Sequence, residues 1–341
     1  MPNLDGTDLC RRLRAERRLR YLPIILLTSR HNEKDMIEGI NAGADAFISK
    51  PFIPSQLLAQ IQVANRILDL EERLAGQLEE VRLSNERLEN DLVAAAAVQC
   101  SLLPQVSPKI RGVNFSWVYE ACERIGGDMF NFFRLDETHV GMYVLDVSGH
   151  GTSAALQSVS LSHVITPFDQ QGGVLKRADG RAGRYELASP AEVARHLNQR
   201  FQMIEKSGQF FTFLYGVIDV PTRSLRYVSA GHPGPIVVST DGARSYDKSG
   251  GIPVGIASNA AYEEGQIQLG AGDKLVFYTD GVLEARNAMG EEFGLERLMR
   301  TLSTAGGDIA HTVRTLESRL GDFAGDVPQR DDVTIVGAHL I

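Results

Sequence analysis

One stretch of the chain, residues 55–103, contains no proline and a single glycine, Gly76. Nothing in this composition ends a helix, so the stretch predicts one long helix. A chain of 341 residues is long enough for two domains of roughly 100–200 residues each. We therefore expect three parts, which are residues 1–54, a helical linker at 55–101, and a larger domain at 102–341.

The second half of the predicted helix carries a seven-residue repeat. Apolar residues recur at alternating spacings of four and three, and one polar residue, Asn85, interrupts them. With Asn85 at an a position, the a positions are Leu78, Asn85 and Leu92 and the d positions are Leu74, Val81, Leu88 and Ala95. One Asn in an apolar seam favours a parallel two-stranded coiled coil in a fixed register. We expect a homodimer through 74–95; the alternative is a single amphipathic helix packed on its own domain.

Charge and composition exclude several classes of protein. The chain has 43 acidic and 35 basic residues, a net charge of −8, so we expect no nucleic-acid partner, because phosphate contacts need clustered Lys and Arg. Three distant cysteines predict neither a disulfide framework nor a cysteine zinc site. No apolar run approaches the ~18 residues of a membrane span, and the first residues lack an apolar signal core. We therefore expect a cytoplasmic protein with no membrane partner.

The first fifty residues alternate predicted helices and buried strands. Helices are expected at 7–20 and 32–42, and strands at 23–28 and 46–49, which is the pattern of a parallel sheet covered on both faces. The segments MPNLDG (1–6), PIILLT (23–28) and GADAFISKPF (43–52) resemble the receiver domains of two-component response regulators, which have a flavodoxin-like α/β fold.

The receiver resemblance implies that Thr28 and Lys50 are the hydroxyl and the lysine that sense an acyl phosphate. It also implies a sensor histidine kinase as the partner of the full-length receiver. The phosphoacceptor aspartate is not in this chain, since its expected place lies just ahead of Met1. Residues 1–54 thus correspond to the C-terminal half of a receiver. We attribute this to a start codon assigned too late; a degraded remnant is the alternative.

After Pro104 the pattern changes to strands followed by helices. Segregation of this kind predicts an α+β layered domain. Strands are expected at 114–120, 140–148, 210–220, 225–231, 235–240, 274–281 and 332–341, and helices at 152–166, 189–205, 294–303 and 309–320.

Four aspartates lie where an apolar strand meets a turn. Asp128 follows Gly126 and Gly127, Asp146 and Asp280 end apolar runs, and Asp331, with Asp332 beside it, precedes one. Two carboxylates ~4 Å apart repel by about 4 kcal/mol at an effective dielectric constant near 20, so four that converge need cations. Two divalent ions balance four carboxylates, and oxygen ligands select Mg²⁺ or Mn²⁺ over Zn²⁺. The alternative is that each aspartate caps its own turn.

Six motifs in this domain resemble the metal-dependent protein phosphatases, in the branch of stage II sporulation protein E. They are IGGDMFN (125–131), DVSGHG (146–151), FFTFLYG (210–216), AGHPGP (230–235), YTDGVLEARN (278–287) and DDVT (331–334). The resemblance implies an α/β/β/α sandwich of two antiparallel sheets between helices. It also implies two Mn²⁺ or Mg²⁺ ions held by Asp128, Asp146, the Val147 carbonyl, Asp280 and Asp331, with Asp332 as a further candidate. The family usually has a carboxylate where this chain has Asn131.

The same resemblance implies a protein serine/threonine phosphatase in which a hydroxide activated by two metal ions attacks the phosphorus directly. Its substrate would be a phosphorylated anti-anti-sigma-type protein. Arg124 is a candidate ligand of the substrate phosphate or, alternatively, a surface residue. His150 and His232 are interpreted as structural residues of turns. Two other functions are an adaptor of phosphatase fold that binds a sigma-factor regulator without catalysis, and a scaffold dimer that acts through its coiled coil.

Overall fold

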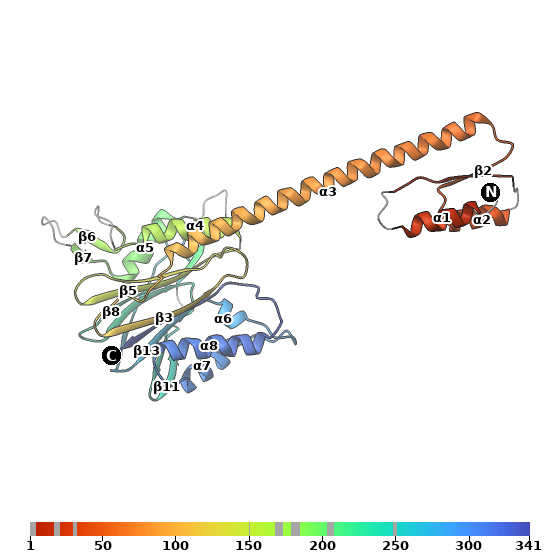
Figure 1. Ribbon diagram of the computed structural model, residues 1–341. Helices are drawn as coiled ribbons and strands as arrows, with labels where there is room; N and C mark the ends of the chain where they lie inside the picture. The colour runs from red at the N-terminus through yellow and green to blue at the C-terminus, as the bar shows by residue number, and fades with distance from the viewer. Residues whose placement is uncertain are drawn as a thin grey trace. The chain divides into compact units, whose positions relative to one another are not determined.

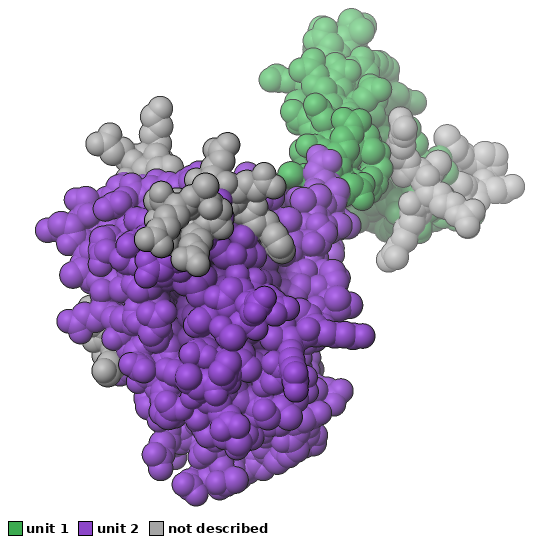
Figure 2. Space-filling view, turned by 90° about the vertical axis from the view of Figure 1, so that its left-hand side faces the viewer, with its two compact units in different colours: residues 1–90 green, residues 91–341 purple. Residues whose placement is uncertain are grey.

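The computed structural model describes residues 5–16, 21–29, 33–149, 151–167, 173–178, 185–202, 208–247 and 251–341. It forms two compact units, Met1–Asn90 and Asp91–Ile341, shown in green and purple in Figure 2. The division falls inside the long helix, so both units contain part of that helix. The predicted domain limits at residues 54 and 101 remain predictions. In the described part of the chain, no helix combines the length and the apolar character that a membrane crossing requires.

The first unit contains two parallel strands with two helices. Its elements ahead of the long helix are α1 (Gly6–Ala15), β1 (Ile25–Thr28), α2 (Glu33–Asn41) and β2 (Ala46–Ser49). The first helix ends earlier than predicted, and residues 17–20 lie outside the described residues. The buried core is small: Cys10, Ala42 and Ala44 form one cluster, and Ile48 on β2 is also buried.

Helix α3 runs without a break over 49 residues, from Pro54 to Leu102, as predicted. Most apolar residues of the heptad seam are exposed in the single chain, with Leu74 at 54%, Leu78 at 63% and Leu88 at 58%, whereas Leu92 is half-buried. Away from the seam, Arg82 forms ion pairs with Glu79 and Glu86 along the helix. The homodimer stays a prediction.

The second unit is built on two five-stranded sheets in which neighbouring strands are antiparallel (Figure 1). The first sheet has the order β11-β10-β13-β14-β3 and the second β12-β9-β8-β5-β4. The strands are β3 (Val113–Glu120), β4 (Met129–Arg134), β5 (His139–Val147), β8 (Phe211–Asp219), β9 (Ser224–Ala230), β10 (Ile236–Ser239), β11 (Gly242–Ser245), β12 (Glu264–Gln268), β13 (Lys274–Tyr278) and β14 (Val333–Leu340). A separate hairpin pairs β6 (Lys176–Ala178) with β7 (Tyr185–Leu187).

The sheets form the two inner layers of a sandwich, and helices form the outer layers. Helices α4 (Thr152–Val164) and α5 (Pro190–Arg200) contact the second sheet, whereas α7 (Gly294–Thr304) and α8 (Ile309–Ala324) contact the first. Large buried side chains, among them Tyr215 and Phe277, fill the core. The predicted α/β/β/α sandwich is confirmed. Elements that were not predicted from the sequence are β4, β6, β7, β11, β12 and the short helix α6 (Gly281–Glu284).

Several helix ends follow from local sequence. Helix α5 begins with a capping box, because the Ser189 side chain accepts from the Glu192 N–H and the Glu192 carboxylate accepts from the Ser189 N–H. It ends at Arg200, earlier than the predicted 205, and residues 203–207 lie outside the described residues.

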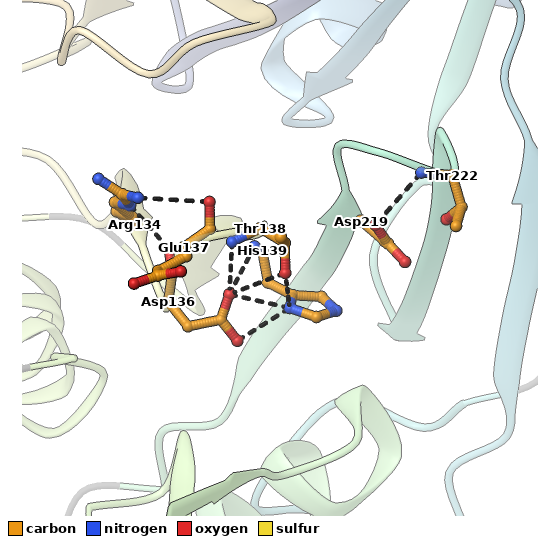
Figure 3. A network of polar contacts seen from close by, with 7 residues as sticks. All are labelled: Arg134, Asp136, Glu137, Thr138, His139, Asp219 and Thr222. Atoms are coloured by element: carbon orange, nitrogen blue, oxygen red, sulfur yellow. Dashed lines mark hydrogen bonds and ion pairs between the residues drawn. The ribbon is translucent and has the colours of Figure 1, made fainter.

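A polar turn joins β4 to β5 and fixes the pairing of these strands. The Asp136 carboxylate accepts hydrogen bonds from the N–H groups of Thr138 and His139 at 2.8 and 2.7 Å (Figure 3). The resulting ladder pairs Met129 with Leu145. Residues 128 and 146 therefore follow directly at the other end of the hairpin, opposite each other.

Candidate metal centre

Strand pairing brings the predicted ligands to one end of the sandwich. Asp128 and Asp146 lie opposite each other on the second sheet. On the first sheet, β13 and β14 pair at Tyr278 and Ile335, so Asp280 just after β13 and Asp331 just before β14 lie at the same edge. Each neighbouring strand pair thus contributes two carboxylates, because antiparallel neighbours place the end of one strand beside the start of the next.

Two threonines connect the sheets through Asp128. The hydroxyls of Thr279 and Thr334, both on the first sheet's side, donate to Asp128 Oδ2 at 2.8 and 2.6 Å. Asp128 itself is 1% exposed. The two hydroxyls fix the carboxylate and leave Oδ1 as the oxygen for a further ligand. Both threonines stand inside the motifs YTDGVLEARN and DDVT, but neither was predicted to have a role.

Asp332 organises the loop that leads to Asp128. Its carboxylate accepts from the backbone N–H groups of Cys122 at 2.8 Å, Gly127 at 2.6 Å and Asp128 at 3.2 Å. The Asp332 carboxylate lies so close to the Gly126 backbone that a Cβ at Gly126 would lie 2.4 Å from Asp332 Oδ2. A side chain at this glycine would therefore displace the carboxylate. These contacts favour a positioning role for Asp332 over direct metal binding.

The aspartates raise one another's pKa. Burial and the neighbouring Asp146 carboxylate raise the pKa of Asp128 well above its ordinary value. Burial, followed by the charges of Asp280 and Asp331, raises the pKa of Asp146 to about 8. Burial and the charge of Glu284 also raise the pKa of Asp280. Mutual repulsion of this kind requires the carboxylates to be near neighbours, and a bound cation would reverse it.

The donor set suits a hard divalent cation, because it consists of carboxylate oxygens and one carbonyl. The Val147 carbonyl faces Gly127, since a Cβ built there would lie 2.8 Å from this oxygen. The carboxylates do not form a complete coordination sphere in this structure. Among the described residues, no three His, Cys, Asp or Glu side chains are arranged to hold one ion. Asp128, Asp146, Asp280 and Asp331 as metal ligands therefore remain a prediction.

The other candidate residues lie around this centre. Arg124 is exposed in the loop after β3 and lines a cavity of about 470 Å³ with Cys122 and Thr152. Asn131 lies on β4, where its side-chain oxygen accepts from the Phe132 N–H at 2.8 Å. His150 lies outside the described residues.

His232 is buried and connects the two sheets. Its Nε2 lies 3.0 Å from the Tyr278 carbonyl, and its Nδ1 lies 2.7 Å from Thr212 Oγ1. Because a carbonyl only accepts, Nε2 carries the proton and Nδ1 accepts from the threonine hydroxyl. Burial lowers the pKa of His232 to about 4, so the ring is neutral at pH 7. These contacts agree with the structural role expected from the sequence.

The end of α3 is bonded directly to the loop ahead of Asp128. The buried Gln99 side chain donates to the Gly126 carbonyl at 2.7 Å and accepts from the Gly126 N–H at 3.2 Å. It also donates to Ser158 Oγ on α4 at 3.1 Å. The position of the helix end and the position of this loop are therefore coupled.

In the first unit, the two receiver residues are neighbours. Thr28 ends β1 and pairs with Ser49 at the end of β2, and the Lys50 N–H donates to the Thr28 carbonyl at 2.6 Å. Parallel pairing thus places both residues at the carboxyl edge of the two strands. Their role in sensing a phosphate remains a prediction.

Comparison with protein families gives two matches. The sequence model described as stage II sporulation protein E matches residues 136–340, which is more than half of the chain. The model of the response regulator receiver domain matches residues 1–62. Both resemblances noted in the sequence are confirmed.

Two curated proteins are similar to the chain. Protein IcfG from Synechocystis sp. is 26% identical over 276 residues, which are 76% of this chain and 43% of that protein. The phosphoserine phosphatase RsbP of Bacillus subtilis is 28% identical over 170 residues, which are 49% of this chain and 38% of that protein. The chain thus spans less than half the length of either relative.

A solved structure shares the fold. The SiaA-PP2C domain of Pseudomonas aeruginosa superimposes with a TM-score of 0.64 at 19% identity, covering 76% of this chain and 99% of that domain. At this level of identity the similarity concerns the fold alone.

Proposed function

The chain belongs to the stage II sporulation protein E family, and we propose that it is a metal-dependent protein serine/threonine phosphatase. The observation that carries the proposal is the gathering of Asp128, Asp146, Asp280 and Asp331 at one end of the sandwich. Burial and neighbouring carboxylates raise the pKa of the first three. Carboxylates held together at this electrostatic cost are typical of functional sites.

In the proposed reaction the four aspartates and the Val147 carbonyl hold two Mn²⁺ or Mg²⁺ ions. When bound, such ions would supply the Lewis acidity that makes water a nucleophile near neutral pH and offsets the phosphoryl charge. The other residues of the site contribute by holding Asp128 and the loop ahead of it in fixed positions. Thr279 and Thr334 orient Asp128, and Asp332 holds the loop ahead of it through three backbone amides.

We further propose that the substrate is the phosphoserine or phosphothreonine of an anti-anti-sigma-type protein. The name of the relative RsbP, a phosphoserine phosphatase, supports phosphoserine as the hydrolysed group. For regulation, we propose that a full-length receiver, which includes the phosphoacceptor aspartate and is phosphorylated by a sensor histidine kinase, acts through a dimer joined at 74–95. The exposed seam of α3 and the bonds between Gln99 and Gly126 provide a physical route for such control.

Phosphate release from a phosphoserine peptide tests the proposed activity. We expect hydrolysis that depends on added Mn²⁺ and falls at least about a hundredfold in Asp128→Asn and Asp280→Asn, because each substitution removes a carboxylate ligand. Asp241→Asn is the matched control, since this exposed aspartate lies in the turn between β10 and β11, and it should retain activity. A wild type that is inert with Mn²⁺ and yet binds a sigma-factor regulator in calorimetry would favour the adaptor function instead.

A further inference from the structure

A cavity of about 610 Å³ opens beside the candidate metal centre. Asp331 and Gly281, the residue after Asp280, belong to its lining. The remaining walls come from the end of β3, from α6, from α8 and from the loop that precedes β14. The volume falls within the roughly 300–1,000 Å³ of typical ligand pockets. The cavity is thus large enough for a segment of polypeptide whose phosphate reaches the metal centre.

The cavity continues away from the metal centre into a second one. This neighbour, of about 370 Å³, shares Val118, Glu120 and Glu317 with the first and is also lined by Trp117 and Cys100. Glu120 and Glu317 therefore lie where the two cavities join, and Glu120, which pairs with Val333, lies close to Asp331. Together the two cavities form a groove, defined here by the shared residues, that leads from the metal centre across β3 and α8.

Carboxylates outnumber free cationic groups along this groove. Glu120, Glu284 and Glu317 line it, and within the described part of the chain their carboxylates make no hydrogen bond or ion pair. Of the two arginines in the lining, Arg286 is paired with Glu292 at 2.7 Å. The other, Arg330, directly precedes Asp331, so its charge lies at the metal end of the groove.

The lining also offers apolar surface between these charges. Val118, Leu320 and Val327 contribute aliphatic side chains to the walls. Lys and Arg combine an aliphatic stem with a charged head, so they can pack their stems on such surface while the head reaches a carboxylate. An acidic side chain in the same place would meet three glutamates of like charge.

We propose that this groove binds the substrate segment next to the phosphoserine and selects segments that carry Lys or Arg. The inference rests on the proposed phosphatase function and adds a substrate preference to it. The phosphoserine lies at the metal end near Arg330, and the basic flanking residues lie over Glu120 and Glu317. Selection by charge at an open groove acts mainly on binding and weakens as salt rises.

Fluorescence anisotropy with the whole chain of 341 residues measures peptide binding to the groove independently of catalysis. The probes are two labelled phosphoserine peptides of one sequence, with two flanking positions occupied either by Lys or by Glu, measured without added metal. An exposed charge pair changes affinity by about twofold to fivefold. We expect the Lys peptide to bind roughly tenfold more tightly at low salt, and the ratio to approach one in 0.5 M NaCl.

Two variants and one control assign the effect to the groove. Glu317→Gln should reduce the ratio of affinities, and Glu120→Gln combined with Glu317→Gln should bring it below about twofold. Glu296→Gln changes an exposed glutamate of α7 that does not line either cavity, so the ratio should persist. Equal binding of both peptides to wild type, or an unchanged ratio in the double variant, would overturn the proposal.

Phosphate release from the same peptides with Mn²⁺ separates the two hypotheses. Hydrolysis of both peptides at equal kcat/KM and with equal affinity would leave the phosphatase function intact and refute the role of the groove. Selective binding without any release of phosphate would refute the phosphatase function.

Discussion

His232 makes the stability of the second unit depend on pH in a specific window. The buried ring is neutral, and burial lowers its pKa from 6.5 to about 4. Between these values the unfolded chain binds a proton that the folded ring does not bind. Folding therefore loses stability as pH falls from 6.5 towards 4, and the stability is fully present above 6.5.

The interval between these two pKa values sets the size of the effect. At about 1.4 kcal/mol per pH unit, the maximum loss is about 3 kcal/mol, and about 2 kcal/mol of it is already lost at pH 5. The variant His232→Gln has no titratable ring and retains an N–H donor for the Tyr278 carbonyl. Wild type should therefore lose about 2 kcal/mol more than this variant between pH 7.5 and pH 5.

Urea unfolding followed by tryptophan fluorescence measures this difference for the second unit alone. The chain has one tryptophan, Trp117, and it lies on β3 of the second unit. Carboxylates that titrate in the same range affect wild type and His232→Gln alike, so they cancel in the comparison. Equal losses of unfolding free energy in the two proteins would refute the assignment of His232 as a buried neutral residue.

Three further predictions concern Asp128, the end of α3 and the heptad seam. Thr334→Val removes a hydroxyl that donates to Asp128 and should weaken activation by Mn²⁺ roughly tenfold, measured as the metal concentration for half-maximal phosphate release. Gln99→Leu leaves a buried backbone N–H and carbonyl without their partner and should lower the unfolding free energy by about 1–3 kcal/mol in urea. Leu78→Pro with Leu88→Pro breaks the seam and should convert a dimer into a monomer in analytical ultracentrifugation.

Matched controls accompany these substitutions. Thr315→Val removes a hydroxyl on α8 that bonds only to its own helix, and it should leave the Mn²⁺ requirement unchanged. Gln77→Leu alters an exposed glutamine of α3 and should leave the unfolding free energy within about 0.5 kcal/mol of wild type. If Thr334→Val has the same Mn²⁺ requirement as wild type, the hydrogen bond from Thr334 to Asp128 does not contribute to activation by the metal. A wild type that sediments as a monomer at micromolar concentration would remove the coiled-coil hypothesis.

The four candidate aspartates could be chosen from the sequence because each one stands where an apolar strand meets a turn, inside a short motif. Sequence patterns did not identify the threonines that hold Asp128 or the three amides that hold Asp332. The threonine bonds join residues 151 and 206 positions apart, and one of the amide bonds joins residues 210 apart. No local pattern indicates which of several polar residues in a turn will face a partner so distant in the chain.

The long helix, the heptad seam and the order of strands and helices depend on neighbours within a few residues, so the sequence alone was sufficient to predict them. Packing of one sheet on the other decided the rest: which oxygen of Asp128 is already bonded, which aspartates repel one another, and where a groove opens beside them. Carboxylate energies depend on burial and on charges nearby in space, and both are set only once distant strands have come together.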